Sequence, residues 1–473
     1  MKRLFTTAIV LLSAAAVLGA QELKTGYFLD HYSYAYRINP AAPINDDPYT
    51  FFMLGIGNTT ASLGSNLGPS TLFHKAGSTW YAFTDTDNYT AALVDKRLNL
   101  NKISSMRAGV DLNILTFGKQ NANNRITVEL NSKTNARLAI PNSVFHILRL
   151  AGTEQDKEYS FKDLSVNVQS YAELAVGYTH QINDMIAVGG RIKGLAGLAN
   201  AGVTLDVYGR KSKVEGKDMY LDLVADANMS YPLPYVFPTY VKDGQDYLDY
   251  DNIGSIDFGG LLKQKMTLPG LGAAIDLGVN ITPFDGLTID VSLLDLGFIS
   301  WKENIRVGGE THSDVETTLD DILPDDWKVQ TGGRHVEMLD FNVHVGAKYK
   351  MPFYDRLSVG LLGTFQNNYV EGRLGVDVTP LDWLSIALST SYGSYGFDLG
   401  TALNIHCKGI NFFVGIDSYP GVGFGLNGEP STFPVGAVLA GFGLVNPTDP
   451  FAKQRMPTLR INTAASFGLL VSF

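Results

Sequence analysis

Neither internal disulfides nor membrane-spanning helices are available to this sequence. Its 473 residues contain one cysteine, Cys407, which has no partner within the chain. After residue 17, no uninterrupted apolar run reaches the roughly 18 residues that a spanning helix needs. Only 18% of the residues are charged, and the net charge of -10 argues against a nucleic-acid partner. A disulfide scaffold and a helical membrane protein are therefore excluded, and a nucleic-acid binder is disfavoured.

Apolar residues and glycine, in contrast, are plentiful. Hydrophobic residues make up 45% of the chain and there are 49 glycines, a mixture that favours strands and tight turns over helices. The first 20 residues (1–20) are typical of a secretory signal peptide, with Lys2 and Arg3 before an apolar run over 4–17. We therefore expect an exported protein whose mature chain begins near Gln21, although Leu18 leaves the exact cleavage site open.

Strict alternation of apolar and polar residues recurs along the chain, as in a strand with one apolar face. The pattern is clear over 164–179 and again over 341–349. The same period of two is found at 106–118, 126–138, 217–228, 271–282, 287–294, 355–365, 371–379, 383–393, 397–406, 410–417 and 459–473.

Two architectures bury such strands. A soluble sandwich uses strands of about 5–6 residues, whereas a membrane barrel needs tilted strands of about 9–11 residues in a closed ring. Here most segments are at least about 9 residues long, and short turns at 182–184, 283–286 and 380–382 alternate with longer connections. The sequence therefore predicts an all-β fold, a transmembrane antiparallel β-barrel of about 14 strands over 101–473. A pair of soluble β-sandwiches is the alternative.

The last segment ends on an aromatic residue. A final strand of this kind resembles the insertion signal that the outer-membrane assembly machinery reads, so we predict an assembly signal here. An ordinary edge strand that ends in Phe is the alternative. The residues that share its apolar phase are Phe467, Leu469, Val471 and Phe473.

Residues 21–100 break the alternation and are rich in aromatic residues. Disordered tails are usually poor in aromatic residues, so we expect this segment to fold inside the barrel as a plug or hatch rather than to form a periplasmic tail. A ligand pocket between plug and wall would be lined by Tyr27, Phe28, Tyr34, Tyr36, Phe51 and Phe52. Long loops are expected near 231–262 and 311–334.

Glycines interrupt the pattern within 185–208. Glycine inside a strand favours a bulge, a bend or the close approach of another backbone. These positions therefore make room for the plug, open the wall sideways to the bilayer, or simply curve the strand. The candidates for a wall opening are Gly189, Gly190, Gly194 and Gly197.

Four short segments resemble landmarks of a Bacteroidota family of uncharacterised outer-membrane proteins. They are Gly-Tyr-Phe-Leu-Asp at 26–30, Tyr-Ala-Tyr-Arg-Ile-Asn-Pro at 34–40, Gly-Gly-Arg-Ile-Lys-Gly-Leu at 189–195 and Leu-Asp-Leu-Gly-Phe-Ile-Ser-Trp at 294–301. The resemblance spans essentially the whole mature chain. It implies a barrel similar to the long-chain fatty-acid transporter group, with around 14 strands and an N-terminal hatch. It implies no catalytic or binding residues.

No motif indicates an enzyme, a metal site or a cofactor. The acidic run over 314–326 lacks the Gly and the terminal Glu of an EF-hand loop, so an exposed loop explains it better than a calcium site. His344 lies on the polar phase of its segment and is expected to face the lumen as a structural group. Serines of 385–391 share a polar strand face without a nucleophile turn. Residues near strand ends that suit an aromatic girdle at the membrane interfaces are Trp301, Trp383, Tyr349 and Tyr392.

The function we expect is passive uptake of a small hydrophobic molecule across the cell outer membrane, through a plugged lumen. The alternative is a docking barrel, without transport, for an envelope secretion or surface-attachment complex. The expected partners are outer-membrane lipid, the assembly machinery and a possible small hydrophobic ligand, with an envelope protein in the alternative. The sequence does not identify the cargo.

Overall fold

The computed structural model describes residues 22–44, 49–55, 57–65, 73–76, 79–82, 85, 88, 90, 92, 103–145, 158–210, 220–231, 239–249, 267–313, 328–367, 369–407, 409–419, 432–433, 456–457 and 463–473. Among these residues no helix is long and apolar enough to cross a membrane. The expected signal peptide and the acidic run over 314–326 lie outside the described residues.

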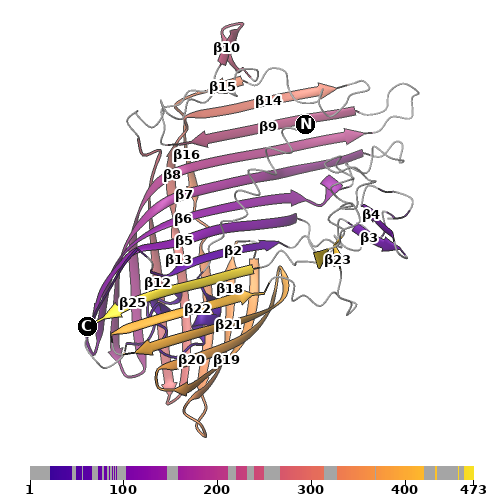
Figure 1. Ribbon diagram of the computed structural model, residues 1–473. Coiled ribbons are helices and arrows are strands. Elements are labelled where there is room, and N and C mark those ends of the chain that lie inside the picture. The colour runs from indigo at the N-terminus through magenta and orange to yellow at the C-terminus, as the bar shows by residue number, and fades with distance from the viewer. Residues whose placement is uncertain are drawn as a thin grey trace.

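The described strands form a closed antiparallel ring of about 14 strands (Figure 1). The first strand of the ring consists of β1 (Tyr49–Leu54) and β2 (Thr59–Ser65). It is followed by β5 (Ile103–Gln120), β6 (Asn124–Pro141), β7 (Glu158–Asn183) and β8 (Ile186–Arg210). The last strand, β25 (Thr463–Ser472), pairs with β1 and β2 and closes the ring.

Three further strands of the ring are built from more than one segment. β9 (Tyr220–Ser230) and β12 (Gly270–Phe284) pair with consecutive parts of β8. β13 (Leu287–Lys302) is continued by β14 (Ile305–Ser313). β15 (Lys328–Gln330), β16 (Arg334–Met338) and β17 (Asn342–Lys350) together form the next strand. The ring then runs through β18 (Leu357–Gln366), β19 (Tyr369–Leu381), β20 (Leu384–Gly393), β21 (Gly396–Cys407) and β22 (Ile410–Ser418).

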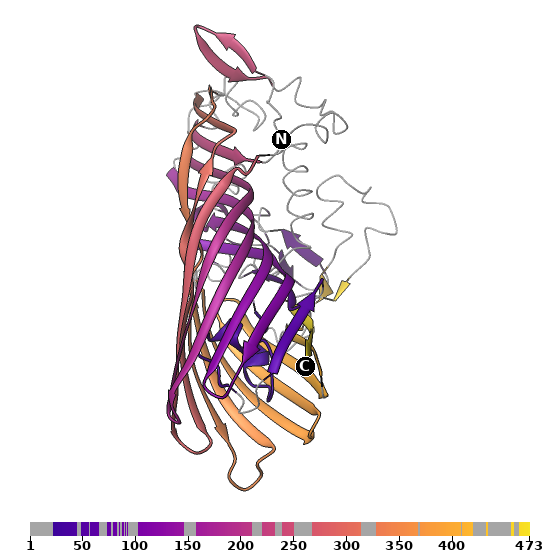
Figure 2. The same cartoon turned by 90° about the vertical axis from the view of Figure 1, so that its left-hand side faces the viewer.

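The rim of the barrel is uneven. β7 has 26 residues, whereas β18 on another side of the ring has 10. The views from two sides show the tall wall of β7, β8, β9 and β14 rising beyond the shorter β19–β22 side (Figure 2). The hairpin of β10 (Thr239–Lys242) and β11 (Gln245–Leu248) pairs with β15 and caps the tall wall. Two short strand pairs, β3 (Phe73–Ala76) with β4 (Thr79–Ala82) and β23 (Thr432–Phe433) with β24 (Met456–Pro457), lie outside the sheet of the ring.

Alternation along the strands separates a lipid-facing surface from the lumen. On β7, Leu174, Val176 and Tyr178 are about half exposed on the outer face, while Glu173 and Ala175 are buried inside. The three predicted short turns link β7 to β8, β12 to β13 and β19 to β20. All three lie at the end of the barrel that holds Phe473. The predicted barrel is therefore confirmed.

The expected boundary between plug and wall is wrong. Within 21–100, residues 22–44 lie inside the ring, with η1 (Lys24–Tyr27) and α2 (Ala35–Ile38), and η1 contacts β20, β21 and β22. However, 49–65 contains β1 and β2, which belong to the wall. These strands were missed because each is short and an interruption at 55–58 breaks the alternation between them. The ring needs them, since β5 and β25 would otherwise present unpaired backbone edges.

Candidate functional site

The candidate site is the plug and the part of the inner wall that holds it. The start of the plug is seated on Asp417 of β22, which accepts hydrogen bonds from the Lys24 amide at 2.7 Å and from the Thr25 amide at 2.6 Å. The Lys24 ammonium binds Glu371 of β19 at 2.9 Å. Arg373 contacts Glu371 at 2.9 Å and also donates to Thr25 Oγ1. Opposite charges and backbone donors thus fix this end of the plug without a covalent bond.

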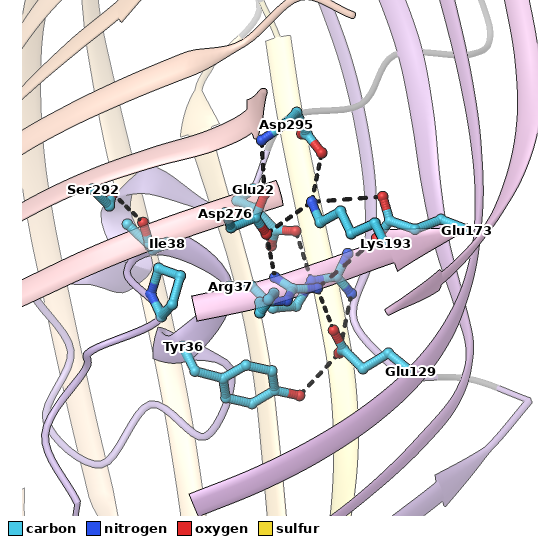
Figure 3. A network of polar contacts seen from close by, with 12 residues as sticks. Glu22, Tyr36, Arg37, Ile38, Glu129, Glu173, Lys193, Asp276, Ser292 and Asp295 are labelled. Atoms are coloured by element: carbon cyan, nitrogen blue, oxygen red, sulfur yellow. Dashed lines mark hydrogen bonds and ion pairs between the residues drawn. The ribbon is translucent and has the colours of Figure 1, made fainter. Parts of the chain in front are cut away.

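A second anchor lies at α2, where Arg37 is almost fully buried. Its guanidinium binds Asp111 of β5 and Glu22 of the plug, each at 2.7 Å. The Tyr36 hydroxyl donates to Glu129 of β6 at 2.9 Å (Figure 3). A buried cation is tolerable only when it is paired in this way, and removing one partner of such a pair costs about 3–5 kcal/mol. The anchor therefore links the plug to neighbouring strands of the wall.

The Arg37 anchor continues into a charged layer of the wall itself. Arg191 of β8 binds Glu129 at 2.5 Å, and Lys193, two residues further, binds Asp276 at 2.8 Å and Asp295 at 2.5 Å (Figure 3). Asp295 reaches this layer because of a bulge. Its φ is +58°, a left-handed conformation that is uncommon for a residue other than glycine. Its amide donates to Asp276 Oδ1 at 2.7 Å at the point where the register between β12 and β13 shifts.

Near the end of the barrel that holds Phe473, the plug turns at Asp30 and His31. Lys348 of β17 donates to the Leu29 carbonyl at 3.2 Å. Burial disfavours ionisation of Asp30, but Lys348 and His31 outweigh it and hold the pKa of that carboxyl below its usual range. Arg125 of β6 binds the carbonyl of Ala42 at 2.9 Å. The plug is thus held by wall charges along the whole of 22–44.

Glycines of the inner wall receive the plug's large side chains. A Cβ atom on Gly375 would lie 2.3 Å from the Phe28 ring, and one on Gly346 would lie 2.5 Å from the Tyr27 hydroxyl. Of the predicted ligand-binding residues, Tyr27, Phe28, Tyr34, Tyr36 and Phe51 come together in one core between plug and wall. Phe52 does not: it follows Phe51 in β1, so it points to the outer face and is 39% exposed.

The four glycines of β8 do not open the wall. Gly189, Gly190, Gly194 and Gly197 pair in register with both β7 and β12. A Cβ on Gly189 would lie 2.2 Å from the Pro40 carbonyl oxygen, so this glycine makes room for the plug. A Cβ on Gly197 would lie 2.4 Å from the Trp301 ring, which is fully buried. Trp301 therefore faces inward, and the expectation that it belongs to an aromatic girdle is wrong.

Other predicted residues lie where their phase placed them. His344 is buried in the lumen, where its ring contacts Thr364 Oγ1 at 3.1 Å. Trp383 and Tyr392 are exposed on the outer face. Phe467, Val471 and Phe473 also face outward on β25, and Leu469 shares their phase. Within the described part of the chain no group of three or more His, Cys, Asp or Glu residues is arranged to hold a metal ion.

Sequence reasoning missed the charged residues that seat the plug. A signal was present in the sequence. Glu129 and Lys133 occupy the polar phase of the segment that forms β6, and Arg191 and Lys193 occupy the polar phase of the segment that forms β8. Charges at a period of two on the lumen phase of several strands indicate a buried ionic layer. Which charges pair across the barrel follows from the register, which the sequence does not give.

Side chains also cross the lumen beyond the plug, toward the tall rim. Arg107 of β5 donates to Gln366 of β18 at 2.8 Å. Asn167 of β7 and Asn200 of β8 both donate to Glu337 of β16, at 2.6 and 2.7 Å. Opposite walls of the barrel therefore touch above the plug as well.

A groove of about 360 Å³ lies in the wall of β18–β21. Leu361, Leu374 and Tyr392 border it with their outward side chains, and Gly363 and Gly372 pair across its floor. The groove is therefore apolar and faces the bilayer.

The solved structures that resemble this chain are distant from it. A family model described as a family of unknown function (DUF5723) matches residues 40–417. No curated protein matches the chain. Among solved structures, the P. putida toluene transporter TodX is 7% identical with a TM-score of 0.38, covering 92% of this chain and 91% of that one. A Pseudomonas aeruginosa FadL homologue is 10% identical with a TM-score of 0.36, covering 96% and 98%. At these scores the neighbours carry no argument about this chain.

Proposed function

The chain belongs to the family of unknown function DUF5723, and from that premise we propose that it admits small, mainly apolar molecules passively across the outer membrane when its plug moves. The observation that carries the proposal is the seat of the plug. Residues 22–44 occupy the lumen, and only non-covalent contacts with the wall hold them there, namely hydrogen bonds, ion pairs and aromatic packing. Such bonds are exchangeable, so the seat is compatible with a closed state and an open one.

Two features support the membrane setting. The outer face carries an exposed apolar band, to which Val176 of β7, Ile192 of β8 and Leu374 of β19 contribute. The ring is closed by β25 and β1, so no backbone edge meets hydrocarbon along most of its circumference. An exported chain with these features belongs in the outer membrane.

A disulfide that fixes the plug to the wall tests the proposal. Thr25 Oγ1 of the plug lies 2.8 Å from Ser389 Oγ of β20, so the variant Thr25→Cys/Ser389→Cys can form a bond once both are cysteine. Cys407→Ser removes the native thiol from the background. The measurement is entry of the apolar dye N-phenyl-1-naphthylamine into intact cells that express the protein. We expect oxidation to abolish entry above the empty-vector level and reduction to restore it.

The matched control is a disulfide that leaves the plug free. Thr134 of β6 and Ser170 of β7 pair within the wall, and their hydroxyl oxygens are 3.0 Å apart. Thr134→Cys/Ser170→Cys should oxidise without slowing dye entry. Equal entry with the plug locked and unlocked would overturn the proposal, as would a large, permanently open conductance of the unmodified protein in planar bilayers.

A docking role is the second candidate, and the hairpin β10–β11 favours it. The hairpin projects beyond the tall rim (Figure 2). Val241, close to its turn, is 70% exposed. Tyr240 of the same hairpin is 37% exposed, and exposed apolar side chains that gather on a projecting hairpin suit a protein partner. Deletion of 239–248 should abolish co-purification with an envelope protein while dye entry stays unchanged, if docking is the function.

A further inference from the structure

Two cations stand directly opposite each other on the outer face of the barrel wall. Lys302, the last residue of β13, pairs in register with Arg334, the first residue of β16. Both side chains are exposed and lie on the lipid-facing phase, since Trp301 beside Lys302 is fully buried on the inner side. Opposite positions of an antiparallel pair bring the Cβ atoms within about 4.5–5.5 Å, and like charges there are destabilising. This cation pair therefore requires a counter-ion.

The described residues do not supply that counter-ion. The two carboxyl groups nearest in sequence, Glu303 and Glu337, lie on the opposite phase and bind polar residues of the lumen. Arg306, farther along the same outer face, is already paired with Asp226. Neither member of the cation pair forms an ion pair within the part of the chain that the structure describes. The negative charge must therefore come from outside this part of the protein.

An apolar surface adjoins the cation pair on the side toward the short turns. Ser300 of β13 stands between Leu271 of β12 and Val336 of β16, which are both 64% exposed. Two residues further along the strands, Phe298 pairs with Met338, and their side chains are 44% and 62% exposed. The outer face thus changes from apolar to cationic within two residues of each strand. Such a change is typical of the border between hydrocarbon and head groups.

The length of β13 places the cation pair at the outer surface of the membrane. Short turns of outer-membrane barrels face the periplasm, and the short turn at 283–286 precedes β13. The 16 residues of β13 rise about 3.3 Å each along a strand tilted by about 40°, so Lys302 lies roughly 40 Å from that turn. A bilayer with both head-group layers is about 40–45 Å thick. The pair therefore lies in the head-group layer of the outer leaflet.

We propose that the cation pair and the apolar surface beside it form a binding site for one phosphorylated glycolipid of the outer leaflet. A phosphate group of the lipid lies between the Lys302 ammonium and the Arg334 guanidinium, and its acyl chains cover Leu271, Val336 and Met338. The phosphate supplies the negative charge that the pair lacks, and a guanidinium can donate to two of its oxygens at once. The site lies outside the lumen, so it is independent of the plug and of any cargo.

Binding of diphosphoryl lipid A to the purified protein in dodecyl maltoside micelles tests the site, with native mass spectrometry as the measurement. We expect Lys302→Gln/Arg334→Gln to bind this lipid about 25-fold more weakly than the unmodified protein, because each basic residue near an anionic head group contributes about fivefold. Lys119→Gln is the matched control and should leave the affinity unchanged. Lys119 is also exposed on the outer face, but it pairs with the uncharged Thr50 and Ile126.

A charge reversal separates lost binding from lost folding. Lys302→Glu places opposite charges across the strands, so it should raise the melting temperature in lipid-free micelles while it weakens lipid A binding. A lower melting temperature would contradict the repulsion on which the site rests. Equal affinity of the unmodified protein and the double variant for lipid A, or an equal loss in Lys119→Gln, overturns the site. Displacement of bound lipid A by millimolar inorganic phosphate would assign the pair to a free anion instead of a lipid.

Discussion

Single residues set how closely the plug approaches the wall. The Phe28 ring lies against the backbone of β19 at Gly375 and of β18 at Gly360, where added Cβ atoms would lie 2.3 and 3.1 Å from it. Cores are packed densely, so one extra methyl group in such a place forces a shift of its neighbours. Glycine at 375 is therefore a requirement of the plug rather than of the strands, whereas a Cβ on Gly360 would also lie 2.8 Å from the Ala347 carbonyl oxygen of β17.

Replacing Gly375 with alanine tests this fit. Gly375→Ala should destabilise the seated plug by about 1–3 kcal/mol, because the methyl group overlaps the Phe28 ring. Gly372→Ala, on the outward face of the same strand, is the matched control, since nothing lies within 4 Å of its added Cβ. Limited proteolysis of residues 22–44 in detergent is the measurement. Equal cleavage of the two variants would contradict the role given to Gly375.

At the scale of elements, the sequence predicted the barrel strands better than the plug inside them. Alternation over 341–349 and 459–473 gives the faces of β17 and β25, because the phase of a strand is a local property. The strands β1 and β2 escaped notice because their interruption hides the alternation. Plug residues such as Lys24 and Arg37 bind wall residues that are distant in sequence, at Glu371 and Asp111. No local pattern carries such pairings, so the seat of the plug was not predictable.

The closing strand offers a prediction of its own. Phe473 exchanges two backbone hydrogen bonds of 2.9 Å with Thr50, and its ring is 77% exposed on the outer face. Deletion of Phe473 removes its aromatic side chain and its backbone pairing with the first strand. We therefore expect about a tenfold fall in the amount of heat-modifiable, folded barrel in the outer membrane, with export unchanged. The measurement is gel mobility of envelope fractions with and without heating.

A second variant separates the two contributions of Phe473. Phe473→Leu keeps the backbone bonds and loses the aromatic ring. If the ring is read as the assembly signal, this variant should assemble as poorly as the deletion. Normal assembly of both variants would contradict the predicted signal at this end of β25.

At the scale of the molecule, charged contacts as well as close packing hold the plug in the lumen of the barrel. Carboxylates outnumber cations by six to three among the described charged wall residues that hydrogen-bond or ion-pair with the plug. These residues are Asp111, Glu129, Asp290, Glu371, Asp377 and Asp417 on one side, and Arg125, Lys348 and Arg373 on the other. Lys24 and Arg37 of the plug pair with Glu371 and Asp111. Because residues 22–44 also contain Glu22 and Asp30, the plug has no net charge, and the excess of wall carboxylates remains.

Removal of the plug should turn the barrel into a cation-selective pore. Deletion of residues 22–44 removes two cations and two carboxylates, so the excess of wall carboxylates stays and now faces water. A lumen lined by an excess of one sign concentrates the opposite ion. In planar bilayers under a potassium chloride gradient, we expect a stable conductance that the full protein lacks, with a reversal potential displaced toward that of potassium. Adding Asp111→Asn and Glu129→Gln to the deletion should move the reversal potential back toward zero, which separates the wall charges from pore size. Anion selectivity, or selectivity indifferent to these two carboxylates, would contradict an excess of negative charge on the inner wall.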